Sequence, residues 1–211
     1  MAYSDFSLYE LTRKFSLTIS EQADLFVSVA EATLSPFLTE LLRENIPLAL
    51  AINTEKARSE MLIAPILIEW RKQVRHQISL FSGVDFTVDV ERGLNGVCDF
   101  IVSRSPEQLF IAAPVMMIVE AKNENLKAGL AQCIAAMLAA QQFNEQEQTH
   151  IQGVYGAVTT GTLWRFAYLE GKGLQVDQPE YYIDKVNKIM GILLWVGDSR
   201  NPAVVQGHEI S

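Results

Sequence analysis

The alternation of hydrophobic and polar residues predicts three successive strands in the middle of the chain. Residues 84–90 alternate as a strand with one buried face does, and residues 91–96 turn the chain back. Residues 97–103 form the second expected strand. Residues 111–120 are apolar on both faces and rich in Val, Ile and Met, which is typical of a central strand covered by helices on both sides.

Three helices are expected before these strands. The first covers residues 20–30, where a serine can serve as N-cap and the apolar residues recur at helical spacing. The second begins at Ser35, just before a proline, and is expected to end by Pro47. The third covers residues 54–74 and is expected to kink at Pro65. The N-terminal part of the chain is therefore predicted to be largely helical.

The second half of the chain predicts a long helix, a strand pair and a closing helix. Residues 125–143 are rich in Ala and Leu and form the strongest helical pattern. Residues 151–159 and 163–169 are strands joined by a tight turn, and residues 181–195 form an amphipathic helix. Residues 1–19 lack a clear period and are expected to be irregular or partly strand-like. This order predicts an α/β fold, with a mixed sheet flanked by helices.

Length and composition define the expected organisation of the chain. A chain of 211 residues that is 49% hydrophobic can bury a full core. We expect a helical extension over residues 1–50, packed on a core domain over residues 51–211. The longest clean apolar run, residues 111–119, is far shorter than the ~18 residues that a membrane-spanning helix needs. With no signal-peptide pattern at the start, these features indicate a cytoplasmic protein without a membrane partner.

The formal net charge of −8 argues against a protein that coats nucleic acid through a general basic surface. Such binding takes its affinity from many Lys and Arg side chains. A local basic cleft remains compatible with this charge, and carboxylates around a metal site would add negative charge that the ion offsets. The charge therefore lowers the expectation of a nucleic-acid substrate without removing it.

Charged residues stand at the ends of the two central strands. Asp99 is near the beginning of the strand over residues 97–103, and Glu120 and Lys122 stand where the run 111–120 ends. Because alternate side chains of a strand share a face, Glu120 and Lys122 point the same way. Mg²⁺ is usually bound by one or two carboxylates, with water or phosphate as further ligands. This stretch therefore predicts a divalent metal site beside an ammonium group.

Two further polar residues are predicted near this strand end. Glu60 adjoins apolar residues 61–63 of the third helix, near the face that would pack on a sheet, and a carboxylate there needs a partner or a metal. A solvated helix residue is the alternative interpretation of Glu60. Gln132 is in the first half of the helix over residues 125–143. Since this helix starts only a few residues after Lys122, its first turns must lie near the charged strand end.

Taken together, these residues resemble the PD-(D/E)XK nuclease superfamily, which has the restriction-endonuclease-like fold. The match consists of Glu60 before the sheet, Asp99 in the second strand, Glu120-Ala121-Lys122 at the end of the third, and Gln132 in the following helix. Residues 155–166 also look like the hairpin that follows the core helix in many proteins of this fold. More narrowly, residues 51–194 resemble a group of uncharacterised cyanobacterial proteins of this fold. The sequence departs from the motif at Cys98, where the name of the superfamily has proline.

The resemblance implies metal-dependent hydrolysis of a phosphodiester. Asp99, Glu120 and the backbone carbonyl of Ala121 would hold Mg²⁺ or Mn²⁺. Lys122 would hold the attacking water and help to stabilise the charge that develops on the phosphate.

The resemblance also implies supporting roles around this centre. Glu60 would join through a water or bind a second ion, and Gln132 would orient the water or the strand. Lys127 and Arg165 are candidates for phosphate contacts, and a purely solvated role is the open alternative for each.

Three functional hypotheses follow from the sequence. The first is a metal-dependent nuclease, with DNA favoured over RNA as the substrate. The second is a restriction-like domain that binds nucleic acid or a protein partner without cutting it. The third is a homodimer or higher homo-oligomer whose grouped subunits supply the basic surface that one chain lacks. Fold alone does not choose among them.

Overall fold

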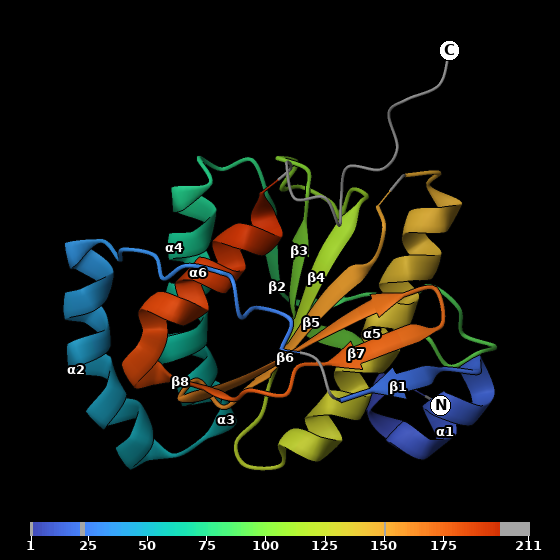
Figure 1. The fold of residues 1–211 in the computed structure, drawn as a ribbon, viewed down its shortest axis with the longest axis horizontal. Coiled ribbons are helices and arrows are strands. Elements are labelled where there is room, and N and C mark those ends of the chain that lie inside the picture. The colour runs from blue at the N-terminus through green and yellow to red at the C-terminus, as the bar shows by residue number, and fades with distance from the viewer. Residues whose placement is uncertain (1, 22–23, 150, 199–211) are drawn as a thin grey trace.

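A mixed eight-stranded β-sheet lies between two layers of helices (Figure 1). The computed structural model describes residues 2–21, 24–149 and 151–198. The strands follow the order β1-β7-β6-β5-β4-β3-β2 across the sheet, and β8 pairs with β6 beside this path. The expected α/β class, with a mixed sheet flanked by helices, is confirmed.

The regular elements have the following bounds. The strands are β1 (Thr18–Ser20), β2 (Ser79–Asp85), β3 (Val97–Ser103), β4 (Val115–Ala121), β5 (Val154–Thr159), β6 (Leu163–Glu170), β7 (Gly173–Val176) and β8 (Tyr181–Tyr182). The α-helices are α1 (Leu8–Phe15), α2 (Pro36–Ile52), α3 (Glu55–Arg58), α4 (Ala64–Gln73), α5 (Leu126–Gln146) and α6 (Val186–Gly197). The described residues also form two 3₁₀ helices, η1 (Tyr3–Asp5) and η3 (Ile183–Lys185), and a π-helix, η2 (Ser59–Ile63).

The centre of the sheet follows the predicted strands most closely. β3 has the predicted bounds, and β4 ends next to the predicted residue 120, although it begins at residue 115 rather than 111. Every residue of β4 is buried, as expected for a strand with helices on both faces. β4 runs antiparallel to β3 and parallel to β5. The parallel pair brings the carboxyl ends of two central strands to the same edge of the sheet.

The two faces of the sheet carry separate buried cores. On one face α5 packs on β4 and β5, and small buried residues such as Ala135 and Ala139 let the helix lie close to the strands. η1 and α1 also pack against α5. On the other face α4 and α6 cover the sheet with α2 outside them, and buried aromatic residues such as Trp70 and Trp164 fill the space (Figure 1).

The predicted helix over residues 20–30 is wrong, because Ser20 ends β1 and residues 25–28 form a turn. Residues 22–23 lie outside the described residues. Side chains from the C-terminal part of the chain bind the backbone of the turn. Asp177 Oδ1 accepts a hydrogen bond from Leu25 N at 2.7 Å, and Lys188 Nζ donates to two carbonyls of the turn. These long-range partners satisfy backbone groups that a helix would otherwise have paired.

The first residues are more regular than their sequence predicted. Ser7 and Glu10 form a capping box at the beginning of α1, a local signal for a helix that was missed. β1 then pairs in parallel with β7, which lies far along the chain. The N-terminal segment therefore contributes a strand to the sheet as well as helices.

The helix α2 begins with Ser35 as its N-cap, as predicted, but its predicted end is wrong. It continues through Pro47 to Ile52, and the predicted domain boundary at residue 50 falls within it. Contacts with η2 support the helix, including a hydrogen bond of 3.0 Å from Asn45 Nδ2 to Met61 O. These contacts hold α2 past a residue that cannot donate a backbone hydrogen bond.

The predicted strand over residues 84–90 is misplaced, because the pairing strand is β2. Phe86 is instead buried against the N-terminal segment, where the hydroxyl of Tyr3 donates a hydrogen bond to its carbonyl. Farther on, an isolated bridge joins Asp89 and Leu94. The alternation in this stretch therefore reflects packing against the N-terminal residues and not pairing within the sheet.

The C-terminal part contains the predicted hairpin and two additional strands. β5 and β6 are joined by the expected turn, Thr160-Gly161-Thr162. β7 and β8 were not predicted, and both pair with β6. Since Tyr181 and Tyr182 form β8, the closing helix begins at Val186 rather than at residue 181.

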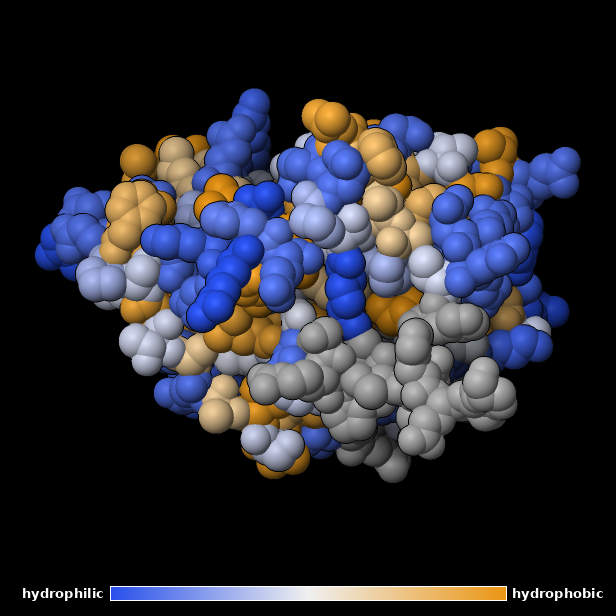
Figure 2. Space-filling view, turned by 90° about the horizontal axis from the view of Figure 1, so that it is seen from above, coloured by the Kyte–Doolittle hydropathy of each residue, from blue (hydrophilic) through white to orange (hydrophobic). Residues whose placement is uncertain are grey.

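Within the described part of the chain, none of the helices combines the length and the apolar character needed to cross a bilayer. Figure 2 looks onto the end of the molecule where β4 and β5 begin, and it shows hydrophilic side chains with hydrophobic ones between them. In the connection between β3 and β4, Leu109 is 92% exposed and Phe110 is 63% exposed. The charged strand ends lie at the opposite end of the sheet.

We expect Asn144→Ala to lower the free energy of unfolding by about 2–4 kcal/mol. Asn144 is a buried residue of α5, and its amide accepts a hydrogen bond from Val115 N at 2.7 Å and donates one to Val115 O at 2.8 Å. The substitution leaves both backbone groups unpaired in the core. Denaturant unfolding measures the loss, and Gln146→Ala, at an exposed position of the same helix, should cost less than about 0.5 kcal/mol. Equal losses in the two variants would contradict this role.

Candidate active site

The charged strand end lies at the edge of the sheet where β4 and β5 both finish, at the lower end of Figure 1. Lys122 N donates a hydrogen bond to Thr159 O at 2.8 Å, which ties the two strand ends together. Asn125 is the N-cap of α5, so the helix begins only a few residues after β4. The short connection keeps the first turns of α5 over this edge. Residues of β3, β4, β5 and α5 therefore meet at one place.

Glu120 is a fully buried carboxylate at the centre of this edge, with 0% exposure. Gln132 Nε2 donates a hydrogen bond of 2.7 Å to Glu120 Oε2. The other oxygen, Oε1, is buried without a hydrogen-bond partner among the described residues. Burial, followed by the negative charge of Asp99, raises the pKa of Glu120 to about 9. A buried oxygen with no partner is costly, and a bound cation would supply the missing partner.

Asp99 lies across the β3–β4 pair from Glu120, because the register joins the next residues, Phe100 and Val119. Asp99 Oδ2 accepts a hydrogen bond of 2.8 Å from Ala121 N. Its side chain is 33% exposed, in contrast to the fully buried Glu120. The site thus has one carboxylate that faces solvent and one that does not. A ligand arriving from solvent would meet Asp99 first.

The ammonium group of Lys122 is close to both carboxylates. Its Nζ lies 3.8 Å from Glu120 Oε2 and 3.9 Å from Asp99 Oδ2, and the side chain is 17% exposed. Both distances exceed that of a hydrogen bond, so the attraction is Coulombic. The N–H donors of Lys122 are therefore not committed to either carboxylate and can bind a water or an anionic oxygen.

Gly129 of α5 makes room for the side chain of Lys122. A Cβ placed on this glycine would lie 2.6 Å from Lys122 Cγ and 3.0 Å from Val158 Cγ1. The aliphatic part of the lysine therefore runs directly against the backbone of the helix. Sequence reasoning missed this residue. An isolated glycine in an Ala- and Leu-rich helix is the signal that could have found it, since glycine costs about 1 kcal/mol relative to alanine there.

Glu60 lies apart from the two carboxylates. It belongs to η2, its side chain is 63% exposed, and Lys56 Nζ is 3.8 Å from its Oε1. η2 is one π-helical stretch, and Pro65 follows it in the first turn of α4, so the regular α-helix is interrupted just before the residue at which a kink was expected. Leu62 and Ile63 of η2 are buried, whereas Glu60 faces solvent. The solvated interpretation of Glu60 describes this structure.

Arg165 shares a row across the sheet with Glu120. Glu120 of β4 pairs with Val158 of β5, and Val158 pairs with Arg165 of β6. Residues paired in this way point to the same face, and two strand spacings separate the ends of the row by roughly 10 Å. Arg165 Nε is buried without a hydrogen-bond partner among the described residues. Lys127, the other phosphate candidate, is exposed in the first turn of α5.

Two carboxylates rather than three are available to hold a metal ion. The described residues include no group of three or more His, Cys, Asp or Glu side chains that could do so. Mg²⁺ is commonly bound by one or two carboxylates, with water and phosphate completing the shell. Asp99 and Glu120 fit this pattern, and the unpaired Oε1 of Glu120 is the atom that most needs a cation. The donors are oxygens, which suit Mg²⁺ or Mn²⁺ better than zinc.

Comparisons with protein-family models, with curated proteins and with solved structures found no match to this chain. The resemblance to the PD-(D/E)XK superfamily therefore depends on the residues themselves. The structure brings Asp99, Glu120, Lys122 and Gln132 together, while Glu60 lies apart.

We expect the metal-free protein to lose stability as the pH rises from about 5 to about 9. The pKa of Glu120 is about 9 in the folded protein and about 4.3 in an unfolded chain. The folded state therefore keeps a proton that the unfolded state releases. This contribution is complete below the unfolded pKa and disappears as the pH passes through the folded one. Thermal unfolding in EDTA should give a Tm several degrees lower at pH 9 than at pH 6.

The substitution Glu120→Gln should remove this part of the decline, because the amide does not titrate. Glu60→Gln is the matched control at an exposed carboxylate and should leave the pH profile of Tm as in the wild type. If Tm falls equally in the wild type and in Glu120→Gln, the proton is held elsewhere.

Proposed function

We propose that this chain is a nuclease that needs Mg²⁺ or Mn²⁺ and hydrolyses phosphodiester bonds of DNA. The observation that carries the proposal is the buried carboxylate of Glu120, which has an unpaired oxygen and lies beside Asp99 and an ammonium group 3.8 Å away. Burying such a group costs several kcal/mol unless it finds a partner. A divalent cation would be that partner. The nearby Lys122 could then act on a water or a phosphate bound to the ion.

Asp99 and Glu120 would hold the ion, with the backbone carbonyl of Ala121 as the further oxygen. When bound, the ion lowers the pKa of a water and polarises a phosphate oxygen. The protein fixes both carboxylates beforehand, because Gln132 binds one and the N–H of Ala121 binds the other. This preorganisation keeps the donors in place while the charge on the phosphate changes.

Lys122 would act on the water and on the phosphate. Its Nζ makes no hydrogen bond to either carboxylate at 3.8 and 3.9 Å, so it can donate to an incoming oxygen. A donor in a partly buried site stabilises negative charge more strongly than it would in water. The backbone at Gly129 limits where the lysine stem can lie, and the ammonium is therefore directed at the carboxylate pair.

The position of Arg165 favours a substrate with more than one phosphate, such as a nucleic-acid strand. Arg165 lies in the same row of the sheet as Glu120, two strands away, and its Nε is buried without a partner among the described residues. Guanidinium groups bind phosphates well because their donors match the oxygens of the anion. One phosphate at the carboxylates and another at Arg165 would belong to the same nucleic-acid strand.

The second candidate function is a domain that binds nucleic acid or a protein partner without cutting. The position of Glu60 favours it, because this carboxylate pairs with Lys56 and does not extend the metal-binding pair. The charge of −8 also offers no general basic surface, unless further copies of the chain combine to supply one.

Cleavage assays decide between the two functions. We expect the wild type to cut DNA in Mg²⁺ or Mn²⁺ and not in EDTA, tested on linear, circular and single-stranded DNA and on RNA. Lys122→Ala and Asp99→Ala should each lower kcat by about 100-fold or more. Lys56→Ala is the matched control, since Lys56 is 82% exposed, and it should keep the wild-type rate.

Two outcomes would overturn the nuclease proposal. Equal cleavage by the wild type and both site variants would identify a contaminating enzyme. Binding of DNA with no cleavage by any form, in either metal, would instead establish the second function.

The role of Gly129 gives a further expectation. Gly129→Ala should lower kcat about 10- to 100-fold with little change in KM, because the new methyl group displaces Lys122 and small misplacements are costly in catalysis. Ala128→Gly, at the exposed neighbouring position, is the control for helix propensity and should change stability without changing kcat. A Gly129→Ala variant with the wild-type rate would show that Lys122 does not need this position.

A further inference from the structure

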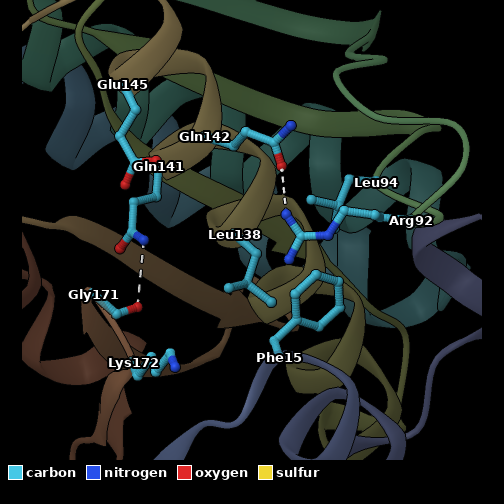
Figure 3. Close-up of a pocket in the computed structure, with 9 residues that line it drawn as sticks. All are labelled: Phe15, Arg92, Leu94, Leu138, Gln141, Gln142, Glu145, Gly171 and Lys172. Atoms are coloured by element: carbon cyan, nitrogen blue, oxygen red, sulfur yellow. Dashed lines mark hydrogen bonds between the residues drawn. The ribbon is translucent and has the colours of Figure 1, made fainter.

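A second concave site lies between α1, the turn at residues 89–94, α5 and the β6–β7 turn (Figure 3). The cavity has a volume of about 290 Å³, near the lower end of the range for small-molecule pockets. Phe15, Leu94 and Leu138 are buried and give it an apolar floor. Segments from distant parts of the sequence thus enclose a space lined by both apolar and charged groups.

Arg92 is held in place by its neighbours. Its guanidinium carbon lies over the ring of Phe15, 4.8 Å from the centroid, and Nη1 donates a hydrogen bond of 3.1 Å to Gln142 Oε1. Asp89 holds both partners, because Oδ1 accepts from Arg92 N at 2.9 Å and Oδ2 accepts from Gln142 Nε2 at 3.2 Å. A charged group fixed in this way loses little conformational freedom when a ligand binds.

The other wall adds a second cation and an oriented amide. Lys172 lines the cavity from the β6–β7 turn, and Gln141 Nε2 donates a hydrogen bond of 3.3 Å to Gly171 O. Gln141 Oε1 is buried without a partner among the described residues. Glu145 also lines the cavity, next to Gln141 on α5 (Figure 3).

We propose that this cavity binds a small phosphate monoester that carries an apolar group. Arg92 and Lys172 reach it from different walls and match a doubly charged anion. The floor at Leu94 and Leu138 matches a ring or a short chain.

This site is separate from the carboxylate pair. Gln141 follows Gln132 by nine residues of α5, which corresponds to roughly 14 Å along the helix axis. Ligand binding in the cavity therefore does not depend on the proposed nuclease activity.

Isothermal titration calorimetry with phenyl phosphate in EDTA tests the proposal. We expect phenyl phosphate to bind, and inorganic phosphate and phenol to bind at least about tenfold more weakly, because one lacks the ring and the other lacks the charge. Arg92→Gln and Lys172→Gln should each weaken binding of phenyl phosphate about tenfold or more.

Arg13→Gln is the matched control, because Arg13 also lies over an aromatic ring, 5.7 Å from the centroid of Tyr9, but on the exposed side of α1. It should leave the Kd of phenyl phosphate unchanged. Lys172 is exposed, so its variant keeps the test valid if Arg92→Gln does not fold. No binding by the wild type, unchanged binding by Lys172→Gln, or an equal loss in Arg13→Gln would overturn the proposal.

Discussion

The buried carboxylate of Glu120 is the constraint on which the strand edge depends. In the metal-free protein at neutral pH this buried carboxyl group keeps its proton, because burial and the charge of Asp99 raise its pKa, and the surrounding elements contact it from three directions. β3 places Asp99 beside it, α5 brings Gln132 to one oxygen, and Lys122, two residues farther along the chain, lies close to both acids. The parallel pairing of β4 and β5 makes this possible, because it leaves the end of β4 open to the beginning of a helix. The fold thus places its most unfavourably buried group, the carboxyl of Glu120, where a bound ligand can supply the missing partner.

The sequence predicted the middle of the fold well because local pattern and tertiary position agree there. The apolar run of β4 and the Ala- and Leu-rich helix α5 are recognisable on their own, and so are the charged residues at the strand end. Residues 20–30 were mispredicted because Asp177 and Lys188 pair their backbone from far along the chain. Of the two interpretations of Glu60, the solvated one describes the structure, and the metal-binding one depended on a regular helical face that the π-helix η2 interrupts. The alignment of Glu120 with Arg165 across the sheet could be recognised only from the register of β4, β5 and β6. The hydrophobic pattern of a sequence does not define this register.

α5 connects the two candidate sites as a single rigid element. Its first half carries Gly129 and Gln132 to the carboxylate pair, and its second half carries Gln141 and Gln142 to the cavity. Between them, small buried residues keep the helix close to β4 and β5, and Asn144 binds the first residue of β4 at the far end. A displacement of α5 relative to the sheet would therefore move residues of both sites.

The parallel pairing of β1 with β7 has a consequence for how the protein is made. Residues 18–20 find their neighbours only when residues 173–175 have been synthesised. Tyr3 meets Phe86 much earlier, so the N-terminal segment can attach to the growing core in two stages. Until the second stage is complete, β7 lacks its outer neighbour and the edge of the sheet stays open to other chains. Synthesis of β7 therefore sets when β1 can reach its final place in the sheet.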